Sequence, residues 1–71
     1  MRIIYHWPPS LNNPKEIIEI EVEGRIIPRD GELVEINLAV SNSESVRKSG
    51  RVVDVVWSIS KDPRVIVYLG A

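Results

Sequence analysis

The sequence has no cysteine, no phenylalanine, one methionine and one histidine, His6. Without cysteine there is no disulfide, no thiolate nucleophile and no Cys-based zinc site, so stability has to come from packing or self-association. A lone histidine does not define a catalytic triad, and no carboxylate spacing completes a metal site around it. We therefore predict a protein that is not an enzyme, with no catalytic residues, no metal site and no cofactor.

Long apolar runs and an excess of one charge are also missing. Residues 1–9 are too short an apolar stretch for a signal peptide, and no segment approaches the roughly 20 apolar residues of a membrane span. Nine Lys and Arg oppose ten Asp and Glu, for a net charge of -1, which argues against nucleic acid as the main partner. We expect a cytoplasmic protein with no membrane partner.

The residues that are present favour strands. Hydrophobic residues make up 44% of the 71, supplied mainly by Val, Ile and Leu, and β-branched side chains suit half-buried pleated surfaces. This length has material for one core, so residues 1–71 are predicted to form a single β domain. The clearest period-two pattern runs through Ile18, Ile20 and Val22, which alternate with glutamates.

Turn residues divide the chain into five predicted strands, over residues 2–7, 16–23, 33–40, 51–59 and 64–69. The last two should form a hairpin. Short strands at this spacing indicate an all-β fold, a small five-stranded antiparallel SH3-like barrel or a curled sheet. The alternation assigns these residues to the core: Ile18, Ile20, Val22, Val34, Ile36, Leu38, Val53, Val55, Trp57, Val65 and Val67.

The final hairpin is apolar on its second face as well. Val52, Val56, Ile66 and Tyr68 would all point away from that core. Either the segment Tyr5–Trp7 covers this face or a second copy of the protein does. We predict at least a dimer, with these four residues in or near the interface.

Residues 41–50 are rich in serine and are predicted to form an exposed loop. Its end offers cations and a hydroxyl that could hold a phosphate, and exposed aromatic rings could hold a base. A loop that is merely solvated is the alternative, and no P-loop spacing is present. The predicted ligand-binding residues are Arg47, Lys48, Ser49, Arg51, Tyr5 and Trp7.

Three segments carry a resemblance to known proteins. Residues 28–34 (PRDGELV), 50–57 (GRVVDVVW) and 65–69 (VIVYL) together resemble the small uncharacterised β-proteins of tailed phages and prophages. The three segments lie within residues 28–69, and their strands and turns are generic. It implies a phage accessory protein in the host cytoplasm, with a structural or host-defence-blocking role, and it transfers no site residue.

Three functional hypotheses follow. The first is a non-enzymatic barrel that self-associates and either sequesters a small anionic, nucleotide-like ligand or masks a host protein. The second is a minor structural or assembly component of a virion. The third is an oligonucleotide-binding barrel, which would need a continuous basic face, whereas here only one loop is basic.

Overall fold

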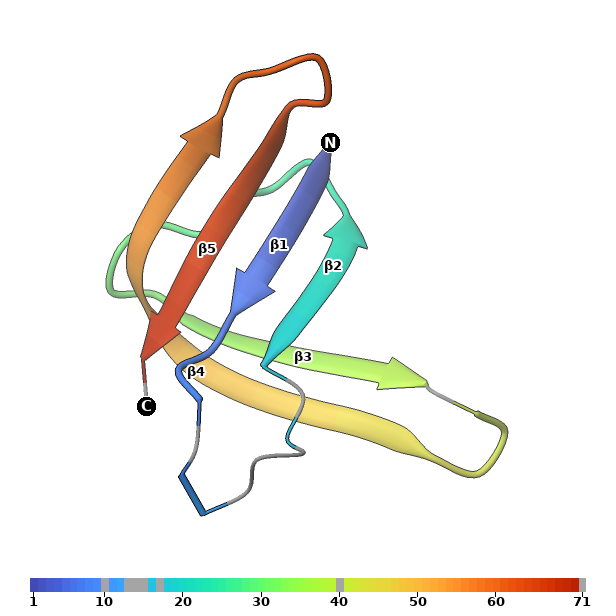
Figure 1. Ribbon diagram of the computed structural model, residues 1–71. Coiled ribbons are helices and arrows are strands. Elements are labelled where there is room, and N and C mark those ends of the chain that lie inside the picture. Colours follow the sequence, from blue (N-terminus) through green and yellow to red (C-terminus); the bar gives the residue numbers. More distant parts are fainter. Residues whose placement is uncertain (10, 13–15, 17, 40, 71) are drawn as a thin grey trace.

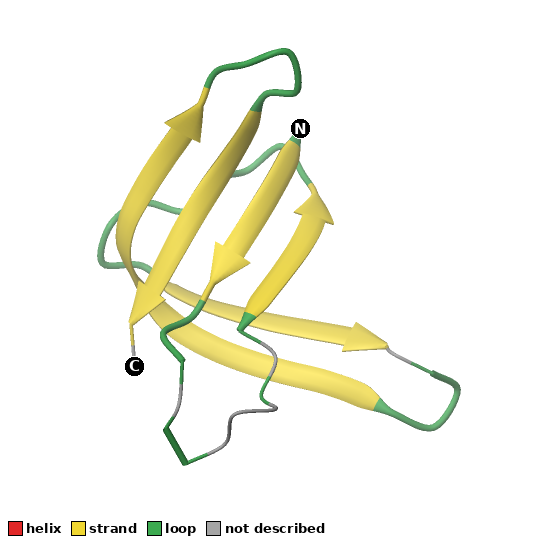
Figure 2. Ribbon diagram, viewed as in Figure 1, coloured by secondary structure: helices red, strands yellow, loops and turns green. Residues whose placement is uncertain are grey.

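The described residues form a single curled sheet of five strands and contain no helix (Figures 1 and 2). The computed structural model describes residues 1–9, 11, 12, 16, 18–39 and 41–70. The strands are β1 (Arg2–His6), β2 (Glu19–Glu23), β3 (Leu33–Ala39), β4 (Ser45–Ser58) and β5 (Arg64–Gly70). The all-β, five-stranded, curled fold predicted from the sequence is confirmed, as is the hairpin of β4 with β5.

The strand order is β2-β1-β5-β4-β3, and the sheet is mixed. The prediction of a wholly antiparallel sheet is wrong at its centre, where β1 and β5 run parallel with Ile3 opposite Val65 and Tyr5 opposite Val67. Parallel neighbours need a long connection, and here that connection contains the other three strands. The first and last strands therefore lie side by side in the middle of the sheet (Figure 1).

Period-two alternation in β1 and β5 builds the core. Val65 and Val67 are fully buried and Ile3 is 1% exposed, so each contributes about 1.5–3 kcal/mol of hydrophobic stabilisation. We call the face that carries them the inner face and the opposite one the outer face. The buried core residues are Ile3, Tyr5, Trp7, Ile20, Ile36, Val52, Val65, Val67 and Leu69.

Strand β4 begins six residues before the predicted start, so the loop expected over residues 41–50 becomes strand from Ser45 onward. The reason is that alternation continues through the polar stretch: Val46 and Lys48 are partly buried, Gly50 and Val52 are buried, and the residues between them are exposed. Lysine fits this pattern because its aliphatic stem can pack while its ammonium group stays accessible.

A bulge at Val53 changes the register of β4 against β5, because Val52 pairs with Leu69 and Asp54 pairs with Tyr68. Val53 was predicted in the core and is instead 61% exposed, while Val52 was predicted at an interface and is buried in the core. Beyond the bulge, Val55 and Trp57 return to the inner face, opposite Val67 and Val65.

Trp57 was also predicted in the core, yet 56% of its surface is exposed. Its face was predicted correctly but its burial was not, because β3 accompanies β4 only from Ser45 to Arg51. Figure 1 shows the two halves of β4 diverging, one along β3 and one along β5. Among the other predicted core residues, Ile18, Val22, Val34 and Val55 are partly buried, and the side chain of Leu38 lies outside the described part.

Gly50 lies where β4 passes close to the end of β5 and leaves no room for a side chain. A Cβ atom there would lie 2.8 Å from the Gly70 carbonyl oxygen and 3.1 Å from the Leu69 Cβ. Gly50→Ala should therefore lower the free energy of unfolding by about 1–3 kcal/mol, measured by urea denaturation. Ser49→Ala, whose side chain is exposed, should change it by less than about 0.5 kcal/mol. Equal stability of both variants would mean that β4 and the end of β5 do not approach each other this closely at Gly50.

Candidate functional site

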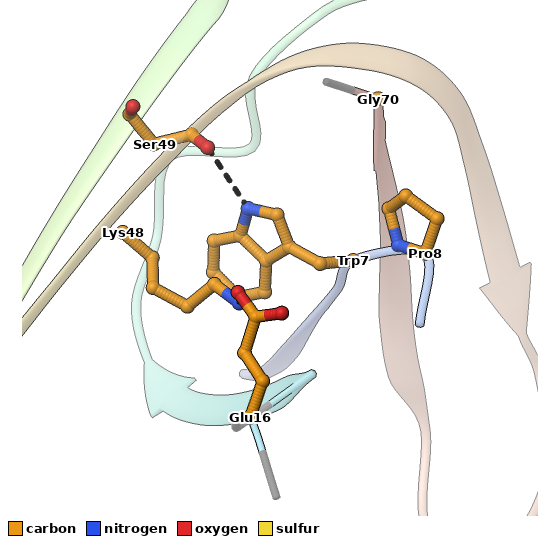
Figure 3. A pocket seen from close by; sticks show the side chains of 6 residues that line it. All are labelled: Trp7, Pro8, Glu16, Lys48, Ser49 and Gly70. Atoms are coloured by element: carbon orange, nitrogen blue, oxygen red, sulfur yellow. Dashed lines mark hydrogen bonds and ion pairs between the residues drawn. The ribbon is translucent and has the colours of Figure 1, made fainter. Parts of the chain in front are cut away.

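A hollow of about 210 Å³ lies beside Trp7, between the end of β1 and the first half of β4 (Figure 3). The indole Nε1 donates to the Ser49 carbonyl oxygen at 3.1 Å, and the Trp7 backbone N–H donates to the Ile18 carbonyl oxygen at 2.8 Å. The Lys48 ammonium stands 5.0 Å from the centre of the ring, within cation–π distance. Three of the predicted ligand-binding residues, Trp7, Lys48 and Ser49, thus meet at one place.

The charge of this hollow is already balanced. Lys48 Nζ lies 2.8 Å from the Glu16 carboxylate, with side-chain exposures of 13% and 35% respectively. An incoming phosphate would have to displace Glu16 from Lys48 and would meet its negative charge at close range. The hollow is therefore built as a packed ion pair against an indole ring and offers little to an anion.

The remaining cations of the predicted site lie on other surfaces. Arg47 is exposed, donates to the Asn37 Oδ1 atom at 3.0 Å and lies 3.5 Å from the Glu35 carboxylate. Arg51 is also exposed and donates to the Gly31 carbonyl oxygen at 2.7 Å. Strand alternation directs the side chains of Arg47, Ser49 and Arg51 away from that of Lys48, so Ser49 contacts Trp7 through its backbone carbonyl.

The two aromatic residues predicted to be exposed are instead core residues. Tyr5 is 8% exposed and Trp7 is 4% exposed, with ring centres 6.5 Å apart. They are buried because β1 enters the centre of the sheet and turns alternate residues inward, beside Val67 and Ile20. Burial raises the pKa of the Tyr5 hydroxyl above its ordinary value.

The predicted interface residues divide between the two faces. Val52 is buried in the core, whereas Val56, Ile66 and Tyr68 belong to the outer face. There Ile4, Ile66 and Val56 lie opposite one another on adjacent strands and form an apolar row, which we call the outer row. The N-terminal segment does not cover this face. It widens it, because β1 contributes Ile4 and His6 at the side of β5.

Charged side chains surround the outer row. His6 Nδ1 lies 3.5 Å from the Glu19 carboxylate, and its ring meets the Tyr68 ring edge-on at 5.4 Å. Arg2 pairs with both Glu21 and Asp62, and the hydrogen bond that its guanidinium donates to Glu21 raises the pKa of Arg2. In the described part of the chain, no group of three His, Cys, Asp or Glu side chains could hold a metal ion.

The most exposed apolar segment was missed in the sequence. In the second half of β4 and just beyond it, Val53 is 61% exposed, Val56 40%, Trp57 56% and Ile59 91%. On the side away from β5, the described residues pair with this strand only as far as Val52, which exchanges backbone hydrogen bonds with Gly31 and Glu32. The sequence did contain a signal for this segment. Apart from Asp54, residues 52–57 are all apolar, so both faces of the strand carry apolar side chains.

No protein-family model matches this chain, and no curated protein or solved structure matches it. The described residues contain no helix long and apolar enough to cross a membrane. The resemblance to phage β-proteins therefore stays a prediction from the sequence.

Because Arg47 and Arg51 lie on surfaces away from Lys48, we make a prediction about nucleotide binding. A panel of mono-, di- and cyclic nucleotides should show no saturable heat in calorimetric titration below about 1 mM, because no described group of unbalanced cations converges on one point. Saturable binding that disappears in the double variant Arg47→Glu/Lys48→Glu would contradict this expectation.

The raised pKa of Tyr5, whose side chain is largely buried, gives the protein a pH dependence. Because its pKa is raised above 10.0 in the folded state, the unfolded chain loses this proton first, and the free energy of unfolding falls as the pH rises above about 10. Tyr5→Phe should flatten this fall, with Tyr68→Phe as the matched control for loss of a phenol from the outer face. Urea titrations across this pH range measure it, and an unchanged slope in Tyr5→Phe would count against burial of the hydroxyl.

Proposed function

We propose that this protein is a non-catalytic protein-binding module that receives an extended segment of its partner along the open edge of β4. The observation that carries the proposal is the edge of β4 that faces away from β5: after Val52 no described residue pairs with it, and exposed apolar side chains flank it. We call this surface, residues 53–59, the β4 edge. The proposal keeps the protein-masking hypothesis and the cytoplasmic location inferred from the sequence.

The backbone of the β4 edge supports strand addition. An edge strand presents free N–H and C=O groups, and an extended peptide can pair with them as one more strand. The Val55 N–H is bonded at 2.9 Å to the carboxylate of its own neighbour Asp54, which is exposed. A carbonyl group of an incoming strand could replace this local contact at little net cost.

The side chains supply affinity and orientation. Trp57 stands on the inner face with more than half its surface exposed, and tryptophan is the residue type that most often dominates protein interfaces. Val56 stands on the outer face at the end of the outer row. An added strand could therefore bury apolar side chains on both of its faces, which favours a partner segment rich in Val, Ile and Thr.

The other hypotheses receive less support. Sequestering a nucleotide would need the cations that the sheet separates, and stacking bases would need Tyr5 and Trp7, which are buried. Virion assembly and a host-defence role both remain compatible with a protein-binding surface, and neither is favoured by a particular contact.

The proposal is tested by selecting short displayed peptides on the immobilised protein and measuring the affinity of the selected sequences. We expect peptides rich in β-branched residues, and Trp57→Lys should weaken them by about 2 kcal/mol, close to thirtyfold. Because Trp57 is more than half exposed, the variant should fold, and circular dichroism checks that it does.

Leu11→Lys is the matched control, because Leu11 is 99% exposed and lies in the connection between β1 and β2. It should leave the affinity unchanged. Peptides that bind the Trp57→Lys variant as tightly as the wild type would show that the β4 edge is not the binding surface.

A further inference from the structure

We propose that the segment received by the β4 edge is the β4 edge of a second copy of this chain, paired antiparallel about a two-fold axis at Val56. This inference rests on the proposed function and names its partner. The curled sheets of the two copies would then join into one continuous sheet, with β4 of each copy at the centre.

The geometry of β4 provides the donors and acceptors for this pairing. The Val55 N–H donates to the Asp54 carboxylate at 2.9 Å, a local contact that an incoming strand can replace. Alternate residues of a strand direct their backbone groups to the same edge, so Trp57 offers its N–H and C=O on that edge as well. In an antiparallel pair centred on Val56, Val55 of one copy faces Trp57 of the other and both hydrogen bonds can form, twice by symmetry.

Charge selects this register among its neighbours. Asp54 is the only charged residue from 53 to 59, and a two-fold axis at Val56 places it opposite Ser58, whose hydroxyl can donate to it. An axis at Val55 would instead place each Asp54 opposite Val56 and bring a carboxylate against the outer row. The Val56 register also sets the exposed Trp57 ring beside Val55, an aromatic–β-branched pair that favours antiparallel pairing.

The apolar surface is continuous across the proposed axis. In one copy the outer row runs from Ile4 through Ile66 to Val56, and Ile4 is followed at the far edge by Glu21. Pairing at Val56 places two outer rows end to end, with an acidic strand at each outer edge of the joined sheet. The most exposed member of the row, Val56 at 40%, lies at the junction, where the second copy covers it.

Sedimentation equilibrium of the full chain should show a dimer. Val56→Lys should raise its dissociation constant at least about tenfold, because the two lysines face each other at the axis. Val56→Glu should do the same, and a mixture of the two variants should form a heterodimer, since lysine then faces glutamate. Leu11→Lys, with its 99% exposed side chain, should stay dimeric.

A second measurement does not depend on a charged substitution. The chain has no cysteine, so Val56→Cys introduces the only thiol, and residues directly opposite in a non-hydrogen-bonded pair are close enough for a disulfide. Mild oxidation should give a covalent dimer of Val56→Cys, while Ser49→Cys, exposed on the other half of β4, should remain at least about tenfold less cross-linked.

A wild-type protein that stays monomeric, a dimer that tolerates Val56→Lys, or a mixture that does not associate would overturn self-pairing. A monomer that still binds selected peptides in a Trp57-dependent way would overturn this inference alone and leave the proposed function standing. A monomer that binds no peptide would remove both.

Discussion

The parallel pairing of β1 with β5 is the contact on which the rest of the structure depends. It joins the first and last strands at the centre of the sheet and places Ile3, Tyr5 and Trp7 beside Val65, Val67 and Leu69 in one core. Strand β2 pairs with one side of this pair and β4 with the other, and β3 attaches through β4. Because the pair forms only after the whole chain has returned, few of the core contacts are local, which is typical of slowly folding β proteins.

The second constraint is that β4 is longer than either neighbour can cover. Its 14 residues pair with β3 in the first half and with β5 in the second. The close approach of Gly50 to Gly70 and the bulge at Val53 lie between the two halves. A strand that changes partners in this way leaves part of one edge open. The open part also carries exposed apolar side chains and a single charged residue, Asp54, which is why we assign binding to it.

Much of the fold could be predicted from the sequence, because apolar and polar residues alternate clearly in a strand that has one solvent-exposed face. Ile20, Ile36, Val65 and Val67 were assigned to the core in this way and are buried. The bulge at Val53 could not be predicted, since it depends on how β4 meets β5. Without it, Val52 was placed on the wrong face. The parallel direction of β1 was missed for a similar reason, because local alternation does not specify which strand is the neighbour.

The candidate site was harder to predict than the fold. Cations close together in sequence suggested one anion site, but alternation along a strand directs Arg47 and Lys48 to opposite faces. The pairing of Lys48 with Glu16 involves residues far apart in the sequence and had no local signal. Tyr5 and Trp7 were expected on the surface because the first strand had no assigned neighbours, and its central position accounts for their burial.

The most direct test of the account is hydrogen exchange of the backbone amides of β4, followed residue by residue by NMR as the protein concentration rises. If the β4 edge is open and receives a second copy, the Val55 and Trp57 amides should exchange fast in dilute solution and become protected at high concentration. In Val56→Lys they should stay unprotected while the amides of the central strands β1 and β5 remain protected. Protection of Val55 and Trp57 that is the same at every concentration and in the variant would contradict an open edge.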